Sequence, residues 1–478
     1  MTILPYSEVY SNRNKVMIWT AMFYFILFAA VYAMISNLLN QVVIKGFDET
    51  NKVLTDIVNG NLNGKVRVDT TQEFVSLSNG INSTVEALNK AITEAAHRLD
   101  KELEFARAIQ YSAVPNMFPP FPEHREFDIF ASMRTAKEVG GDFYDFFLVE
   151  NNKLGFVIAD VSGKGIPAAL FMMTAKTHLK NYMSSGRSLK DAVEAANNSL
   201  CENNEAEMFV TAFAGILNYT TGELRFVNCG HNSPLLRHNG TYEWMRQKSG
   251  LMLGIMSGMP YKEYTLNLTH GDLLYLYTDG VTEAMNAEGK LYGDETLIKY
   301  LNNHSRLGVS EILYSVSSSV DYYADGAPQA DDITMLALEY GKATEKELAK
   351  MFPAGINQLE PITDFINTEL DECRCPDKIR NEIDVCIEEL YVNIVNYSGA
   401  QIVDIVTKHY ISPAGICISI IDSGVPFDPV KHSDPKKVEK IEDAKVGGLG
   451  IEMVRKMTDV FMYRREDDKN KTTICRFW

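Results

Sequence analysis

Four aspartates in the middle of the chain stand beside glycines or at the ends of stretches rich in β-branched and aromatic residues. They are Asp142 in EVGGDFYD, Asp160 in VIADVSGKG, Asp279 in LYTDG and Asp331 in DDIT. Taken singly, each is explained as a turn residue, because Asp-Gly and Asp-Ser are common turn pairs. The strand ends of one sheet can converge, however, and carboxylates brought together repel each other and take up protons unless cations hold them.

Oxygen ligands without His or Cys suit Mg²⁺ or Mn²⁺. Two such ions can share a water, lower its pKa and clamp a phosphoryl group for in-line attack, which requires no protein nucleophile. The aspartates together therefore predict a two-metal site for phosphoryl hydrolysis. Arg134 and Lys137 lie near Asp142 in the sequence and are the candidate cations for the phosphate.

A second set of polar residues follows in the last quarter of the chain. Glu389 and Asn393 lie four residues apart in CIEELYVNIVNYSG, whose apolar spacing predicts a helix, so that both side chains share one face. Asp422 ends the strand-like run IID and precedes Gly424. The glycines of GGLG, at 447–450, stand just before a predicted helix, whose N-terminal amides can receive phosphates. This order of motifs predicts nucleotide binding.

Short strands separated by turns must position the four aspartates. Between about Phe127 and Tyr340 the runs are rich in β-branched and aromatic residues and are bounded by Gly, Asn or Asp. Helical stretches, IPAALFMMTAKTHLKNYM and a segment that starts near Val309, lie between them, and this mixture predicts a layered domain with sheet cores. The predicted strands are LGFVIADVS, TAFAGILNY, ELRFVNCG, DLLYLYTDG and DDITMLALEY, with Thr220-Thr221-Gly222 as a hairpin turn.

The last domain has a different pattern. KATEKELAK, at 342–350, is predicted to be a charged connector. Beyond it we expect helices, then the strands QIVDIVTKHY and GICISIID, a lysine-containing loop, and a final helix and strand.

The N-terminal region contains VMIWTAMFYFILFAAVYAMI, twenty residues at 16–35 without a charge. As a helix this run is about 30 Å long, enough to cross a bilayer, so we predict a membrane span; a buried core helix and a cleaved signal peptide are the alternatives. Two helical patterns then flank NGNLNG. The second has one apolar stripe, formed by Phe74, Leu77, Ile81, Val85 and Leu88.

Composition limits the function further. The 478 residues predict two to four domains, and 46% hydrophobic with 23% charged residues is typical of globular proteins. The net charge of −17 argues against a nucleic-acid partner. The seven cysteines include no CxxC pair, so neither a zinc site nor a disulfide framework is predicted, and we expect a reducing compartment.

The motifs EVGGDFYD, IADVSGKG, NCGHNSPLL, LYTDGVTEA and DDIT, in this order, resemble the SpoIIE-type branch of metal-dependent (PPM) serine/threonine phosphatases. The resemblance covers about 104–340 and implies a β-sandwich flanked by helices that hydrolyses phosphoserine or phosphothreonine. It further implies that Asp160 bridges two Mn²⁺ or Mg²⁺ ions and that the Val161 carbonyl contributes. Asp279 and Asp331 would complete the shell of one ion, and Asp142 would serve the other.

EExxxN, DxG and GGLG, in order over about 345–478, resemble the GHKL ATPase superfamily and most closely its anti-sigma-factor serine kinases. By this likeness Asn393 holds Mg²⁺ on ATP, Asp422 accepts the adenine amino group and Glu389 is the general base. Tyr397 departs from the pattern, since many relatives carry a histidine there. The likeness further implies that Gly424 lets the backbone pass the base, that Gly448 and Gly450 line the phosphates, and that Thr473 touches adenine through water.

The predicted fold is therefore multidomain: a transmembrane helix, a helical relay that resembles HAMP, an α+β PPM phosphatase domain and an α/β GHKL (Bergerat) ATP-binding sandwich. We expect a homodimer at the cell membrane, single-pass, with cytoplasmic catalytic domains. The partner implied is a phosphorylated anti-anti-sigma-type protein, and possibly a sigma factor. The expected boundaries are a head at 1–15, the span at 16–36, the relay at 38–95, a linker helix at 96–120, the phosphatase at 121–341 and the ATPase at 345–478.

Two other functions remain as alternatives. The ATPase domain could bind ATP or a partner without phosphotransfer. A sensor histidine kinase would need a phosphoacceptor histidine in a helix just before the ATPase domain, and residues 341–388 contain no histidine.

Overall fold

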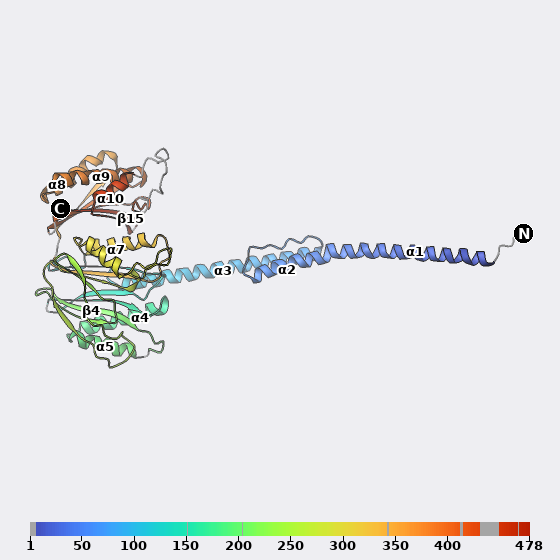
Figure 1. The fold of residues 1–478 in the computed structure, drawn as a ribbon, viewed down its shortest axis with the longest axis horizontal. Helices are drawn as coiled ribbons and strands as arrows, with labels where there is room; N and C mark the ends of the chain where they lie inside the picture. The colour runs from blue at the N-terminus through green and yellow to red at the C-terminus, as the bar shows by residue number, and fades with distance from the viewer. Residues whose placement is uncertain are drawn as a thin grey trace. The chain divides into compact units, whose positions relative to one another are not determined.

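The computed structural model describes residues 6–150, 152–202, 204–341, 344–411, 414–430, 449–466 and 468–478. Two compact units divide the chain, Met1–Leu103 and Glu104–Trp478 (Figure 1).

The first unit is helical. It contains α1 (Tyr6–Leu39), a short π-helix η1 (Asn40–Ile44), α2 (Lys45–Val58) and the first part of α3 (Gln72–Ala113). Within the described residues, one continuous helical stretch, Lys15–Val58, is long and apolar enough to cross a membrane. The helix expected at 16–36 is confirmed as a helix, and that it spans a bilayer stays a prediction.

A small core joins the two helical segments that flank the NGNLNG turn. Val66 and Val68, in the stretch after the turn, are buried with Phe74 at the start of α3. Val53 of α2 and Ile81 of α3 pack against them. The predicted arrangement of helix, connector and helix is therefore confirmed. Helix α3 then continues past the boundary expected at residue 95 and ends at Ala113.

The middle domain consists of two five-stranded antiparallel sheets with helices on their outer faces. Helices α4 and α5 contact the sheet β2-β3-β4-β5-β8, and α6 and α7 contact the sheet β1-β10-β9-β6-β7 (Figure 1). All five predicted strands and both predicted helices are present. The bounds are β1 (Phe127–Arg134), β2 (Phe143–Val149), β3 (Lys153–Val161), α4 (Ile166–Met183), α5 (Leu189–Cys201), β4 (Val210–Asn218), β5 (Glu223–Cys229), β6 (Leu235–His238), β7 (Thr241–Trp244), β8 (Tyr264–Asn267), β9 (Leu273–Tyr277), η2 (Asp279–Val281), α6 (Asp294–Asn303), α7 (Val309–Ala324) and β10 (Ile333–Tyr340).

The C-terminal domain is an antiparallel sheet of order β11-β12-β13-β15-β14. Apolar side chains on one face of this sheet form a core with helices α8, α9 and α10. Side chains on the other face, such as Tyr410 and Phe477, share a core with α7 of the middle domain. The bounds are β11 (Thr344–Pro353), η3 (Ile356–Gln358), α8 (Leu359–Glu372), α9 (Asp377–Tyr397), β12 (Ile402–Ile411), β13 (Ala414–Asp422), α10 (Leu449–Met457), β14 (Val460–Glu466) and β15 (Lys469–Phe477).

The connector predicted at 342–350 is wrong for most of its length, because Thr344–Pro353 is the edge strand β11. The domain therefore opens with a strand and not with helices. Charged side chains on an edge strand discourage pairing with other chains, and they also hide the strand from a hydropathy pattern.

A disulfide joins Cys417 of β13 to Cys475 of β15, contrary to the expectation that no disulfide forms. The two residues are 58 positions apart in the sequence but directly opposite each other in the antiparallel ladder, with 4.1 Å between their Cα atoms. Cysteine spacing alone could not reveal this pair, because only the register of β13 and β15 brings the two together.

Candidate functional site

The ends of four strands bring the predicted aspartates together. Asp142 immediately precedes β2, Asp160 is the penultimate residue of β3, Asp279 follows β9 and Asp331 precedes β10. The charge of Asp160 interacts with those of Asp279 and Asp331, and its side chain also contacts Asp142. The structure therefore assembles in one place four residues that lie up to 189 positions apart in the chain.

Asp142 lies deepest in this cluster, with 1% of its surface exposed. The hydroxyl of Thr278, the residue before Asp279, donates a hydrogen bond of 2.7 Å to its Oδ2. Burial, followed by the charges of Asp160 and Asp332, raises the pKa of Asp142 well above the usual value. In the absence of a cation, the structure thus disfavours the ionised form of this carboxyl.

Two further carboxyls show the same effect. Burial and the charge of Asp279 raise the pKa of Asp160 to about 7. Burial, Glu283 and Asp331 raise the pKa of Asp279 to about 6. A cluster of carboxylates that binds cations takes up protons when the cations are removed, and raised pKa values are the sign of this. The residues present therefore fit hard divalent ions.

The glycines of EVGGD allow the backbone to come close to β3. A Cβ atom on Gly141 would lie 2.7 Å from the carbonyl oxygen of Val161, too close for any other residue. Asp332 fixes the same loop, since its carboxylate accepts hydrogen bonds from the backbone N–H groups of Ala136 (2.7 Å) and Gly141 (2.8 Å). The loop thereby places Asp142 beside the carbonyl of Val161, the two groups that the sequence assigned to the site.

One cation at the cluster was not predicted from the sequence. Lys164, in the SGKG turn after Asp160, has its Nζ 2.8 Å from Oδ2 of Asp331. The same Nζ donates a hydrogen bond of 2.7 Å to the carbonyl of Ala330. Arg134, which the sequence suggested as the phosphate-binding cation, instead pairs with Asp321 of α7.

The second predicted site lies on the helical face of the C-terminal sheet. Asn393 of α9 and Asp422 at the end of β13 line one pocket together with Asn470 and Thr472 of β15. Glu389, one turn before Asn393, faces the start of α10: a Cβ atom on Gly450 would overlap its carboxylate. The structure therefore brings together the predicted base, the predicted magnesium ligand and a helix N-terminus.

Hydrogen bonds orient the buried Asp422. Its Oδ1 accepts from the N–H of Gly424 (2.8 Å) and from Nδ2 of Asn470 (3.1 Å). Within the described residues both donors bind Oδ1. Oδ2 is therefore the atom that can accept a hydrogen bond from an adenine amino group. Asn470 was not predicted, because nothing in the sequence near it marks it as a partner of Asp422.

Thr473, which was expected to touch adenine through water, lies outside the pocket lined by Asn393 and Asp422. Its hydroxyl lies 2.8 Å from that of Ser419, on the sheet face that packs toward α7. Its neighbour Thr472 faces the nucleotide pocket instead, because successive side chains of a strand point to opposite faces. Gly448 and the lysines of the loop before it lie outside the described residues.

Comparisons with known proteins match this architecture. Residues 150–341 match the family described as stage II sporulation protein E (SpoIIE). Residues 352–476 match the family described as a histidine kinase-like ATPase domain. The middle domain is thus similar to the SpoIIE family, and the C-terminal domain is similar to the histidine kinase-like ATPase domains. The first match includes Asp160, Asp279 and Asp331, and it begins after Asp142.

Several curated proteins resemble the chain over about half of its length. Protein IcfG of Synechocystis sp. is 28% identical over 292 residues, which are 55% of this chain and 45% of that protein. Phosphoserine phosphatase RsbU of Bacillus subtilis is 28% identical over 242 residues, 50% of this chain and 70% of that protein. Phosphoserine phosphatase RsbP of the same organism is 23% identical, over 48% of this chain and 56% of that protein. The chain therefore spans less than half of IcfG.

Solved structures also resemble the chain. The SiaA-PP2C domain of Pseudomonas aeruginosa has a TM-score of 0.46 and 21% identity, and the match covers 52% of this chain and 98% of that domain. The RsbU and RsbW domains of a Mycobacterium tuberculosis protein have a TM-score of 0.40 and 20% identity, with 73% of this chain and 93% of that structure covered.

The end of helix α3 reaches the phosphatase site directly. Gln110, 4% exposed, donates a hydrogen bond from Nε2 to the carbonyl of Gly140 (2.7 Å) and accepts one at Oε1 from the N–H of the same residue (3.1 Å). Because Gly140 lies two residues before Asp142, the position of α3 constrains the loop that carries this aspartate.

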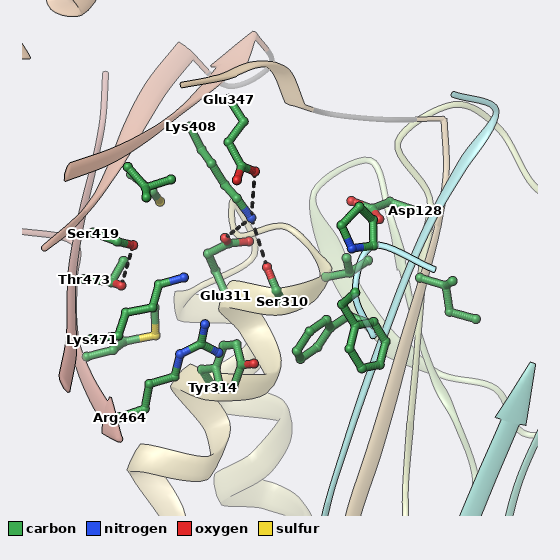
Figure 2. Close-up of a pocket in the computed structure, with 18 of the residues that line it drawn as sticks. Asp128, Ser310, Glu311, Tyr314, Glu347, Lys408, Ser419, Arg464, Lys471 and Thr473 are labelled. Atoms are coloured by element: carbon green, nitrogen blue, oxygen red, sulfur yellow. Dashed lines mark hydrogen bonds and ion pairs between the residues drawn. The ribbon is translucent and has the colours of Figure 1, made fainter. Parts of the chain in front are cut away.

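A cavity of about 360 Å³ lies between the phosphatase and ATPase domains (Figure 2). At its edge Lys408 of β12 forms an ion pair of 3.0 Å with Glu311 of α7, and Arg464 of β14 lies 3.9 Å from the ring centre of Tyr314. The cavity contains none of the predicted catalytic residues. Its lining instead shows that one face of the ATPase sheet contacts the phosphatase domain.

Proposed function

We propose that the chain is a metal-dependent protein serine/threonine phosphatase, held at the membrane by α1 with both catalytic domains in the cytoplasm. The observation that carries the proposal is the convergence of Asp142, Asp160, Asp279 and Asp331 at four strand ends. Burial and neighbouring carboxylates raise the pKa values of Asp142, Asp160 and Asp279. The predicted roles of these residues, and of the Val161 carbonyl, agree with this arrangement.

Two Mn²⁺ or Mg²⁺ ions at these carboxylates would activate a water and neutralise the phosphoryl oxygens. Asp160 would be a ligand common to both ions, Asp279 and Asp331 would hold one of them, and Asp142 with the Val161 carbonyl would hold the other. Lys164 places an ammonium group at the edge of the cluster, beside Asp331, where it can attract the phosphate of a substrate.

The helical N-terminal unit would control this site. Its relay continues into α3, and the two hydrogen bonds between Gln110 and Gly140 connect the end of that helix to the loop of Asp142. A groove of about 550 Å³ in the first unit, lined by apolar side chains such as Leu54, Leu77 and Leu88, is suited to a second copy of the helix pair. We therefore propose a homodimer whose helices position the phosphatase loop.

For the ATPase domain we propose binding of Mg²⁺-ATP and transfer of a phosphoryl group to a serine. Glu389 is half-buried and adjacent to Gly450, so a hydroxyl bound at the start of α10 would lie within reach of this base. The proposed protein partner of both domains is an anti-anti-sigma-type regulator with one phosphorylatable serine, possibly in complex with a sigma factor. The second candidate, ATP or partner binding without transfer, requires only Asn393 and Asp422.

Phosphate release from a phosphoserine form of such a regulator tests the phosphatase. The full chain in detergent is assayed with Mn²⁺, with EDTA and as Asp160→Asn. Asp325→Asn is the matched control, since Asp325 is an exposed aspartate in a left-handed conformation that asparagine also adopts. We expect release to require Mn²⁺ and to be lost only in Asp160→Asn. Equal activity of the two variants would contradict the proposal.

Transfer of label from [γ-³²P]ATP tests the kinase separately. Glu389→Gln should abolish transfer and leave ATP binding intact, whereas Glu388→Gln, at the exposed neighbouring position, should change neither. Binding without transfer in the wild-type chain would favour the second candidate.

A further inference from the structure

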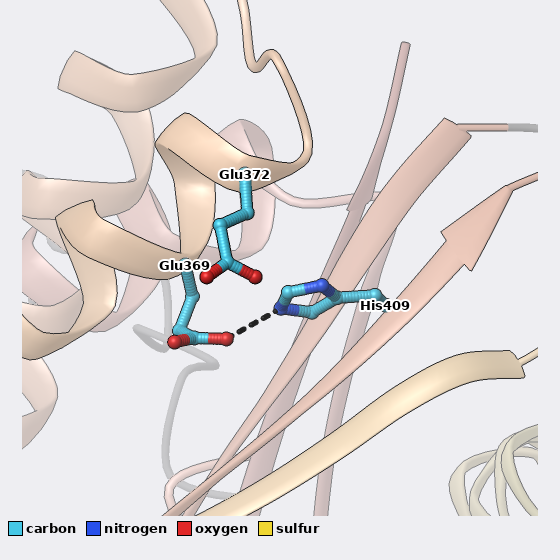
Figure 3. A group of neighbouring side chains, drawn as sticks. All are labelled: Glu369, Glu372 and His409. Carbon is cyan, nitrogen blue, oxygen red and sulfur yellow. Dashed lines mark ion pairs between the residues drawn. The ribbon is translucent and has the colours of Figure 1, made fainter.

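A second cluster of possible metal ligands lies in the ATPase domain, apart from the nucleotide pocket. Glu369 and Glu372 are three residues apart at the end of α8, and His409 of β12 lies beside their carboxylates (Figure 3). Each of the three offers one ligand atom, and these atoms all lie within 4.8 Å of one another. None of the three lines the pocket of Asn393 and Asp422.

The cluster is buried on one side and open on the other. Glu369 is 3% exposed and His409 is 6% exposed, whereas Glu372 is an exposed residue. The exposed Glu372 leaves a path by which an ion can enter from solvent.

The imidazole nitrogen that faces the carboxylates forms an ion pair with Glu369 and no directed hydrogen bond within the described residues. Nε2 of His409 lies 2.9 Å from Oε2 of Glu369. Despite this distance, Nε2 forms no properly directed hydrogen bond with any residue in the described part of the chain. The two atoms are therefore close together without the alignment that a shared proton would favour.

Convergence on a common cation explains such a contact. With bonds of about 2.0–2.2 Å, two ligands of one zinc ion lie about 3 Å apart at a right angle and slightly further apart at a tetrahedral angle. The observed 2.9 Å is close to this range. Glu369 and Glu372 are one helical turn apart, so both carboxylates can turn toward the same point above the strand.

We propose that Glu369, Glu372 and His409 bind one divalent transition-metal ion of the zinc type. An imidazole ligand favours zinc and similar ions over Mg²⁺ and Ca²⁺, which prefer oxygen ligands alone. The ion would cross-link the end of α8 to β12. Because α8 packs against α9, the helix of Glu389 and Asn393, the ion stabilises the support of the nucleotide site without touching the nucleotide.

Zinc binding to the purified full chain tests the proposal. Bound zinc is counted by mass spectrometry after titration against a chromophoric chelator, in wild type, Glu372→Gln and His409→Gln. Glu360→Gln is the matched control, because Glu360 is an exposed glutamate on the first turn of the same helix. We expect the first two variants to lose one tightly bound zinc, or to bind it at least about tenfold more weakly, and the control to retain it.

X-ray absorption at the zinc edge separates this site from the phosphatase cluster. The proposed ligands of that cluster are aspartates and a backbone carbonyl, without a histidine. An imidazole signal that disappears in His409→Gln therefore reports on this site alone. Glu372→Gln, at an exposed position, keeps the test valid if the buried His409 variant fails to fold. Equal zinc content in wild type and Glu372→Gln, or zinc without an imidazole ligand, would overturn the proposal in favour of a simple ion pair.

Discussion

Replacing Asp160 by asparagine should stabilise the phosphatase domain when metal is absent. The pKa of this carboxyl is raised from 3.8 to about 7, first by burial and then by the charges around it, Asp279 above all. Each pKa unit corresponds to about 1.4 kcal/mol, so ionisation of Asp160 above pH 7 destabilises the metal-free folded state by on the order of 4 kcal/mol. Asparagine has nearly the same shape and no charge to desolvate.

The direction of the pH dependence follows from the raised pKa. Between pH 4 and pH 7 the unfolded chain releases this proton while the folded chain retains it, so the metal-free wild type loses stability as the pH rises through this interval. Above pH 7 the loss is complete. Asp160→Asn should lack this component of the pH dependence, and its advantage over the wild type should therefore be largest at alkaline pH.

Thermal unfolding of the full chain in EDTA, at pH 5 and pH 8, measures the effect. For a domain of this size 4 kcal/mol corresponds to about 10 °C in the melting temperature. We expect Asp160→Asn to melt about that much higher than wild type at pH 8, and Asp325→Asn to melt like wild type. Added Mn²⁺ should raise the wild-type value and have much less effect on Asp160→Asn. A variant that is less stable than wild type at pH 8 in EDTA would refute the view that these carboxylates crowd one another.

Three further outcomes are expected. Gln110→Ala removes both hydrogen bonds to the phosphatase loop and should raise the Mn²⁺ concentration for half-maximal phosphatase activity about tenfold. An unchanged concentration would show that the contact with α3 does not affect metal binding at the site. Burial opposes ionisation of Glu311, but Lys408 lowers the pKa of Glu311 to about 2. The ion pair therefore contributes stability above pH 4.5, and this contribution is lost as the pH falls toward 2. Denaturant titrations of Glu311→Gln should show neither the contribution nor its pH dependence. Thr472→Val should weaken ATP binding about tenfold in calorimetry, and Thr473→Val should not. The reverse result would mean that the nucleotide binds on the sheet face of Thr473.

Local patterns in the sequence were sufficient for most of the middle domain. The predicted helix IPAALFMMTAKTHLKNYM coincides with α4, which runs from Ile166 to Met183. The predicted strands correspond to observed strands because each is a short apolar run ended by Gly, Asn or Asp. The aspartates could be found in the same way, since each stands at one boundary of such a run: Asp160 and Asp279 close a run, and Asp142 and Asp331 precede one.

Contacts between distant segments could not be predicted in this way. The charged edge strand β11 carries no strand-like hydropathy pattern, and the Cys417–Cys475 pair depends on the register between β13 and β15. Lys164 lies only four residues after Asp160, so the signal for it was present in the GKG turn. Its partner Asp331 is 167 positions away, however, and only the fold brings the two together.

The position of Thr473 shows how one contact can determine the function of a whole strand. Asp422 is directly opposite Asn470 in the ladder, so these two side chains share a face, and Thr472 shares it with them. Thr473 is then opposite Ser419 on the other face, toward α7. The alternation of β15 therefore directs its even-numbered side chains to the helical face, which holds the pocket of Asp422, and its odd-numbered side chains to the face toward α7. A shift of one residue in the register of β15 exchanges the two faces.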